Sequence, residues 1–111
     1  MRFLALIVAL SACGGGPDVD RLLGAQCTGD SECDERCLGP NRDFPEGLCS
    51  LRCAEDRDCP GDARCVNSNG GVCLYECRDD LDCDFLGDAW GCRAQVLEAD
   101  PTTEVDVCLG R

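Results

Sequence analysis

Cysteine thiols and carboxylates are the groups of this chain whose number and spacing could do chemistry. Cysteine fills 13 of 111 positions and 22 residues are acidic, whereas His and Lys are absent. Cysteines at this density form either disulfides in an oxidising compartment or metal sites. Three C-x3-C pairs fall within the range of zinc ligands, but the chain has no C-x-C and no C-x-x-C, the latter being the usual redox motif. The spacing therefore favours a disulfide scaffold, and no metal site is favoured.

Twelve of the cysteines form a repeat. The segments CTGDSEC, CAEDRDC and CRDDLDC share the pattern C-x-x-D-x-D/E-C, and each opens a block of four cysteines. These blocks span 27–49, 53–73 and 77–108. Four cysteines allow three pairings. We favour first with third and second with fourth, because this pairing pins the acidic turn to both ends of the segment that follows. The proposed disulfides are Cys27–Cys37, Cys33–Cys49, Cys53–Cys65, Cys59–Cys73, Cys77–Cys92 and Cys83–Cys108.

The acidic residues of the repeat have two interpretations. In the structural one, the first acid caps its turn by accepting backbone N–H bonds two or three residues further on, and the second lies on the solvated face. The first acids are Asp30, Asp56 and Asp80, and the second are Glu32, Asp58 and Asp82. The alternative is a calcium site, which needs six to eight oxygen ligands. The calcium candidates are Asp80, Asp82 and Asp84, which do not fit the EF-hand pattern because Gly91 stands at the twelfth position.

The few aromatic residues are the other candidates for a site. Trp90 and Phe85 lie in CDFLGDAWGC, and Tyr75 lies between the second and third blocks. We expect them to form a small core against a disulfide. The alternative is an exposed contact for a partner, since aromatic residues dominate binding hot spots.

Composition weighs against catalysis and against nucleic acid. Without His no Ser-His or Cys-His nucleophile pair can form, and without Lys no Schiff base can form. Paired carboxylates remain, but three small stapled units do not predict a deep cleft. The net charge of −12 disfavours polyanionic partners. We expect no catalytic residue, no enzyme activity, no cofactor and no nucleic-acid partner.

The elements that position the cysteines are expected to be short. Large apolar residues are too few for a large core, so disulfides must supply much of the stability. Between the third and fourth cysteines of each block, turn residues interrupt short extended stretches, as 69–71 do between Val66 and Val72. The longest hairpin is expected in the third block, around 100–102. The fold class is a small disulfide-rich protein with three tandem four-cysteine units of short β-hairpins and turns.

The N-terminal residues have the plan of an export signal. Residues 1–12 carry Arg2, an apolar run and small residues, and the run is too short to cross a membrane. Residues 10–13, Leu-Ser-Ala-Cys, resemble the lipobox of bacterial lipoproteins. The resemblance implies that Cys13 receives a diacylglyceryl group and becomes the first residue of the mature chain. Two acyl chains or more would anchor the protein stably.

Residues 13–26 are expected to be the lipidated N-terminus and a flexible tether, because glycine, proline and aspartate dominate them. The alternative is that Val19, Leu22 and Leu23 dock on the domain.

The repeated unit itself resembles the cysteine-rich repeats of lipoproteins from myxobacteria and related bacteria. It also resembles, in this motif alone, the N-terminal cysteine-rich region of Dickkopf-type secreted proteins. That region has adjacent cysteine pairs and a different charge balance, so no function is carried over from it.

These features predict a lipid-anchored, non-enzymatic cell-envelope lipoprotein that acts as a binding or structural module at the bacterial surface, the outer membrane or the periplasm. Its expected partners are the membrane, through lipid on Cys13, and a protein or envelope component. The alternative functions are a secreted disulfide-rich inhibitor or ligand and a calcium-binding module.

Overall fold

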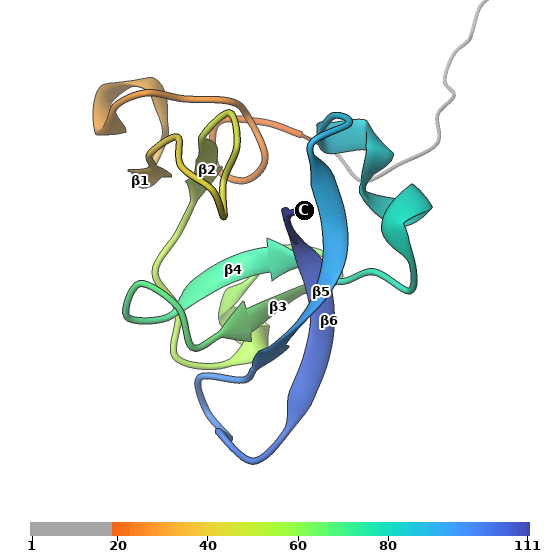
Figure 1. The fold of residues 1–111 in the computed structure, drawn as a ribbon. Helices are drawn as coiled ribbons and strands as arrows, with labels where there is room; N and C mark the ends of the chain where they lie inside the picture. The colour runs from red at the N-terminus through yellow and green to blue at the C-terminus, as the bar shows by residue number, and fades with distance from the viewer. Residues whose placement is uncertain (1–18) are drawn as a thin grey trace, which may run out of the picture.

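The computed structural model describes residues 19–111, so Cys13 and the expected signal at 1–12 lie outside the described residues. Three antiparallel hairpins make up the fold, one in each cysteine block (Figure 1). The strands are β1 (Arg36–Leu38), β2 (Leu48–Ser50), β3 (Ala63–Val66), β4 (Val72–Tyr75), β5 (Trp90–Val96) and β6 (Glu104–Gly110). A 3-10 helix precedes each hairpin: η1 (Asp30–Glu32), η2 (Asp56–Asp58) and η3 (Asp80–Leu86). Within 19–111, no helix is long and apolar enough to cross a bilayer. The predicted fold class is confirmed.

The hairpin of the second unit turns at the predicted residues. Val66 pairs with Val72, and Asn69, Gly70 and Gly71 all have positive φ angles, at 51°, 84° and 100°. Glycine adopts such angles without a steric cost. A Cβ atom on Gly71 would also clash with the carbonyl oxygen of Cys53. Glycine at position 71 therefore lets the turn pack closely against the backbone at Cys53, the first cysteine of the unit.

The third hairpin is the longest, as predicted, with seven residues in each strand. Asp100 organises its turn, because its carboxylate accepts hydrogen bonds from the backbone N–H of Thr102 at 3.1 Å and from two hydroxyls. These belong to Thr102 and Thr103, each at 2.6 Å. These bonds hold the pKa of Asp100 below its ordinary value, the Thr102 hydroxyl contributing most.

Backbone hydrogen bonds join the units to one another. The N–H of Asn67 donates to Val96 O at 2.8 Å, and the N–H of Glu98 donates to Cys65 O at 3.0 Å. At the other end of the third hairpin, the N–H of Gly110 donates to Asp43 O at 2.8 Å in the first unit. The third unit thus contacts both the first and the second unit directly.

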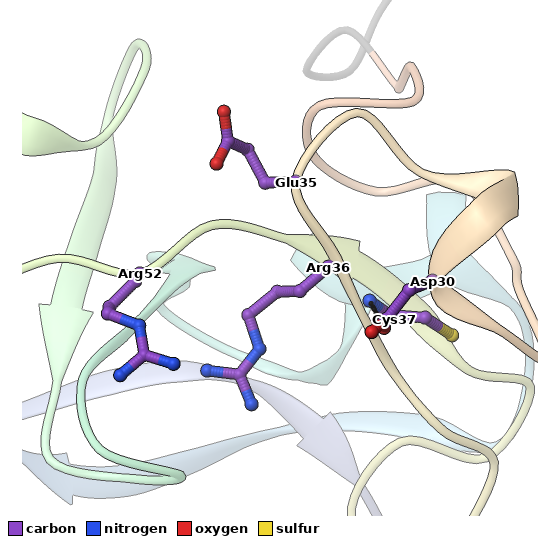
Figure 2. A pocket seen from close by; sticks show the side chains of 5 residues that line it. All are labelled: Asp30, Glu35, Arg36, Cys37 and Arg52. Atoms are coloured by element: carbon purple, nitrogen blue, oxygen red, sulfur yellow. Dashed lines mark hydrogen bonds between the residues drawn. The ribbon is translucent and has the colours of Figure 1, made fainter.

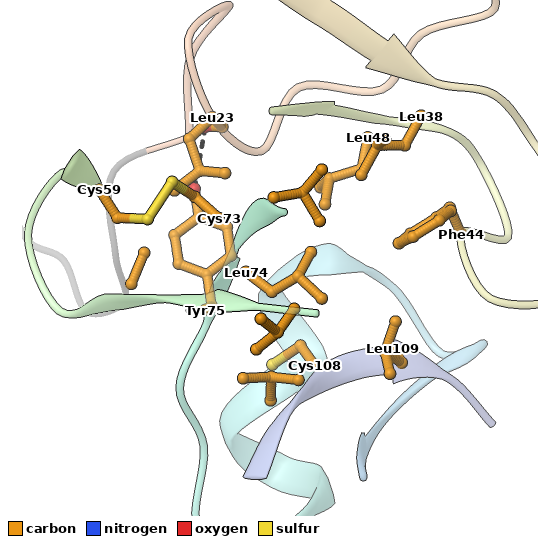
Figure 3. Close-up of a cluster of buried hydrophobic side chains, with 14 of the residues drawn as sticks. Leu23, Leu38, Phe44, Leu48, Cys59, Cys73, Leu74, Tyr75, Cys108 and Leu109 are labelled. Atoms are coloured by element: carbon orange, nitrogen blue, oxygen red, sulfur yellow. Dashed lines mark hydrogen bonds between the residues drawn. A yellow bond between two sulfur atoms is a disulfide. The ribbon is translucent and has the colours of Figure 1, made fainter. Parts of the chain in front are cut away.

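One hydrophobic core is shared by all three units (Figure 3). Each unit contributes residues with exposed fractions of only a few percent, and Ser50 is buried beside them with its hydroxyl donating to Cys73 O at 2.7 Å. The larger members of this core are Leu38, Phe44, Leu48, Val66, Val72, Leu74, Leu86, Trp90, Val107 and Leu109. No unit could bury this much apolar surface alone, so the core links the folding of each unit to that of its neighbours.

The expectation that 13–26 is a flexible tether is wrong for its second half. Leu23 is 3% exposed and belongs to the shared core, whereas Leu22 is half-buried and Val19 is exposed. Gly24 N–H donates to Cys49 O at 2.9 Å, and Cys49 N–H donates to Ala25 O at 2.8 Å. Composition favoured a coil, but burial of one leucine and pairing with the first unit's β2 hold this segment in place.

Candidate functional site

Each unit contains two disulfides that connect its acidic turn to its hairpin. The pairs are those favoured from the sequence: first with third and second with fourth cysteine in every unit. The third and fourth cysteines face each other across the hairpin, in the pairs Cys37 with Cys49, Cys65 with Cys73, and Cys92 with Cys108. The two disulfides of a unit therefore lie side by side against the paired strands of its hairpin. None of the six connects two units.

The clustering of sulfur atoms in each unit follows from this arrangement. Sulfur atoms from three cysteines of a unit lie within 4.8 Å of one another. Metal ligation requires thiolates, and each of these sulfurs is bonded to another sulfur. The close spacing of these sulfur atoms therefore reflects two adjacent disulfides and not a metal site.

The first acid of the repeat has the same partner in all three units, the backbone N–H of the third cysteine. Asp30 Oδ1 accepts from Cys37 at 2.9 Å, and Asp56 Oδ1 accepts from Cys65 at 2.8 Å. In the third unit the acceptor is Asp80 and the donor is Cys92, at 2.8 Å. The predicted cap two or three residues further on is therefore wrong: the acid reaches seven, nine or twelve residues ahead, because the disulfide from the first to the third cysteine brings that strand to it.

The second acid closes the turn from the other side. Glu32 accepts from the N–H of Thr28, Asp58 from that of Ala54 and Asp82 from that of Arg78, at 2.6, 2.9 and 2.8 Å. Each donor directly follows the first cysteine of its unit. The expectation that these acids lie on the solvated face is confirmed, because all three are exposed; in addition, each accepts a backbone hydrogen bond that closes its turn.

These hydrogen bonds alter the acidity of two of the second acids. The backbone N–H of Thr28 contributes most to holding the pKa of Glu32 below its ordinary value. The N–H of Ala54 does the same for the pKa of Asp58. Hydrogen bonds donated to a carboxylate favour its charged form.

The three calcium candidates have different surroundings. Asp80 accepts from Cys92 and lies 3.3 Å from an Arg111 nitrogen. Asp82 accepts from the N–H of Arg78. Among residues 19–111, the three carboxylates are not brought together into a group that could hold an ion. Calcium binding by these residues stays a prediction without geometric support.

The aromatic candidates are not the exposed contacts of the alternative interpretation. Trp90 is 1% exposed and Tyr75 7% exposed. The rings of Tyr75 and Phe85 pack edge to face with centroids 4.8 Å apart, and Phe85 is half-buried against the core. The Tyr75 hydroxyl donates to Leu23 O at 2.9 Å and so holds the docked N-terminal segment. The favoured expectation that Trp90, Phe85 and Tyr75 form part of a small core is confirmed, and the alternative that they are exposed partner contacts is wrong, because the core has few other large residues.

A pocket at the junction of the first and second units was not predicted. It has a volume of about 430 Å³ and is lined by Asp30, Glu35, Arg36, Cys37 and Arg52 (Figure 2). Arg36 lies inside the first cysteine block, whereas Arg52 lies in the linker between the first and second blocks. Only the pairing of strands brings them to one pocket, so no signal in the sequence marks them.

These features define the protein as a small, disulfide-rich, mostly β-hairpin protein built from three repeats. Comparison of the chain with family models, with curated proteins and with solved structures finds no match.

Proposed function

We propose that this protein is an exported, lipid-anchored and non-enzymatic binding module of the bacterial cell envelope, with Cys13 as the site of lipidation. One observation carries the proposal: the twelve cysteines from 27 to 108 all pair within their own units. The thirteenth cysteine stands in the Leu-Ser-Ala-Cys motif at the end of an apolar run. Pairing of the others frees this thiol for another chemistry.

The disulfides support export to an oxidising compartment. Six disulfides in so short a chain are typical of proteins that fold outside the cytosol. Glutathione and thioredoxin keep cytosolic thiols reduced, and a fold with a small core depends on its covalent links.

The docked N-terminal segment would keep the anchored domain close to the bilayer. Asp20 is held by backbone bonds with Leu23 and Ala25. Only residues 14–19 separate it from Cys13, and a fully extended chain of that length spans at most about 25 Å. A module on so short a link presents its surface to ligands of the envelope itself.

The side-chain chemistry of the chain supports binding rather than catalysis. His and Lys are absent from the sequence, and both acids of each repeat are engaged with backbone N–H groups. These carboxylates serve as hydrogen-bond acceptors for the backbone of their units, which supports a structural role for them.

Mass spectrometry of the N-terminal peptide tests the anchor. The full chain is expressed in a bacterium that processes lipoproteins, and the membrane fraction is analysed. The expected peptide begins at Cys13 and carries a diacylglyceryl group, and the Cys13→Ser variant loses both the modification and the membrane association. A free thiol or a disulfide at Cys13 in the exported wild-type chain would overturn the anchor and favour a secreted inhibitor or ligand.

A further inference from the structure

We infer that the pocket between the first and second units is a binding site for an oxyanion, a single carboxylate or phosphate group, held by Arg36 and Arg52. This inference deepens the proposed binding role by naming the chemistry of the ligand. It does not depend on the lipid, because the pocket lies wholly within 30–52.

The pairing of arginines elsewhere in the molecule sets this pocket apart. Across residues 19–111, six arginines form ion pairs with carboxylates: Arg21, Arg57, Arg64, Arg78, Arg93 and Arg111. The other arginines of that range, Arg36, Arg42 and Arg52, form none. Acids outnumber cations by about two to one in this chain, so an arginine without a carboxylate is unusual, and two of these three line one pocket.

The two guanidinium groups face the same space. Figure 2 shows Arg36 and Arg52 extending in the same direction, whereas the Glu35 side chain points the opposite way. Asp30 is the other acid of the lining, and its Oδ1 accepts from the N–H of Cys37. The lining holds two guanidinium groups and two carboxylates and is formally neutral, but neither guanidinium is paired with a carboxylate within the described residues, so both can bind an added anion.

Both arginines are carried by backbone that is fixed in place. Arg36 lies in β1 and pairs with Ser50 of β2. Arg52 forms an isolated antiparallel bridge with Val72, and Cys53 N–H next to it donates to Gly71 O at 3.2 Å. One arginine therefore belongs to the first unit, and the other is attached to the second. The backbone that carries the two arginines therefore needs no rearrangement when a ligand binds.

The hydrogen-bonding capacity of the pocket matches an oxyanion. A guanidinium has five N–H donors in a planar fork that fits the two oxygens of a carboxylate or phosphate. Arg36 uses one nitrogen, Nη1, on the carbonyl oxygen of Asn69 at 3.2 Å, which orients its fork toward the second unit. Its remaining donors and those of Arg52 are available to a ligand. The acids nearby and the net charge of −12 favour one small anionic group over a polyanion.

Titration of the full-length chain in nonionic detergent tests the site by NMR of the arginine side-chain N–H groups at constant ionic strength. Three probes separate the sources of the oxyanion: inorganic phosphate, a short peptide with a free C-terminal carboxylate, and the same peptide as its amide. We expect saturable shifts at Arg36 and Arg52 with phosphate, with the free peptide or with both, and none with the amide.

Substitutions then assign the shifts to the pocket. Arg36→Gln and Arg52→Gln should each weaken binding by about tenfold or more, the loss expected for a charge-assisted hydrogen bond. Arg42→Gln is the matched control, because Arg42 also has no carboxylate partner within 19–111 but does not line the pocket; it should leave binding within about twofold. Absence of saturation with every probe, or equal weakening by the control, would overturn the site. The lipid on Cys13 is read separately by mass spectrometry, so failure of one proposal is distinguishable from failure of the other.

Discussion

Asp56 Oδ1 accepts a hydrogen bond from the backbone N–H of Cys65 at 2.8 Å, and its Oδ2 lies 2.7 Å from Nε of Arg64. One carboxylate thus holds both the backbone of a disulfide-bonded residue and the side chain before it. The same guanidinium also contacts Glu76 at 2.8 Å. The equivalent contacts of Asp30 and Asp80 with Cys37 and Cys92 make this bond a property of the repeat.

Removal of this carboxylate should destabilise the fold. We expect Asp56→Ala to lower the free energy of unfolding by about 1–3 kcal/mol, because it leaves the N–H of Cys65 without an acceptor and Arg64 with one partner fewer. Asp62→Ala in the same unit is the matched control, since Asp62 is exposed and makes no side-chain bond within the described residues; it should change the free energy by less than about 0.5 kcal/mol. Urea unfolding followed by circular dichroism measures both, and equal effects would contradict the structural role.

Acid should destabilise the protein below about pH 4. The pKa values of Glu32, Asp58 and Asp100 are lowered in the folded chain by hydrogen bonds from Thr28, Ala54 and Thr102 respectively. A carboxylate with a lowered pKa contributes stability that is fully present above its unfolded value, near 4, and is lost as the pH falls through the folded value. Melting temperatures measured from pH 7 to pH 2 should therefore fall at the acid end.

A single variant isolates one of these groups. Asp58→Asn should melt below the wild type at pH 7 and approach it at pH 2, because the amide does not titrate. Asp62→Asn should keep the acid profile of the wild type. Parallel profiles for Asp58→Asn and the wild type would show that Asp58 contributes nothing to the acid transition.

The hydroxyl of Tyr75 should control the docking of the N-terminal segment. Tyr75→Phe removes the donor to Leu23 O, which keeps one bond from Asp20 N–H at 3.0 Å. We expect a loss of about 1 kcal/mol and faster hydrogen exchange at Gly24 and Ala25, measured by NMR. Leu81→Ala, at a residue 75% exposed, is the control and should leave both exchange rates unchanged. Unchanged exchange in Tyr75→Phe would show that the hydroxyl does not hold the N-terminal segment in place.

Trp90 should behave as a core residue. Acrylamide should quench its fluorescence weakly, because the side chain is 1% exposed. Trp90→Ala should cost about 3–5 kcal/mol. Trp90→Phe should cost markedly less, since it also removes the indole N–H, which is buried without a hydrogen-bond partner in the described structure. Losses below about 0.5 kcal/mol for both variants, or strong quenching, would argue that the ring is accessible.

Local spacing explains why the units and their disulfides could be predicted. The cysteine pattern recurs three times, so it marks where each unit begins and ends. In the second unit, an Asn-Gly-Gly turn between two valines also marks the hairpin turn. The favoured pairing needed only the idea that a turn is held at both ends of a hairpin. All of these contacts lie within one unit.

Contacts between distant residues explain what could not be predicted. Leu23 docks because Tyr75, 52 residues away, donates to its carbonyl. The first acid of each unit accepts a hydrogen bond from the third cysteine, and the sequence of the acidic turn does not indicate this partner. Arg36 and Arg52 line one pocket through the pairing of Arg36 with Ser50 and of Arg52 with Val72.

The segment between the third and fourth cysteines differs in length from unit to unit, although the same bonds close every unit. The segment between the third and fourth cysteines has eleven residues in the first unit (38–48), seven in the second (66–72) and fifteen in the third (93–107). Both disulfides and the first acid hold the hairpin at its third and fourth cysteines, so the length of the segment between them does not alter the bonds that close the unit. In an evolving family such an arrangement would allow new surfaces to be acquired by insertion, and a protein engineer could graft a loop at 99–102 on the same ground.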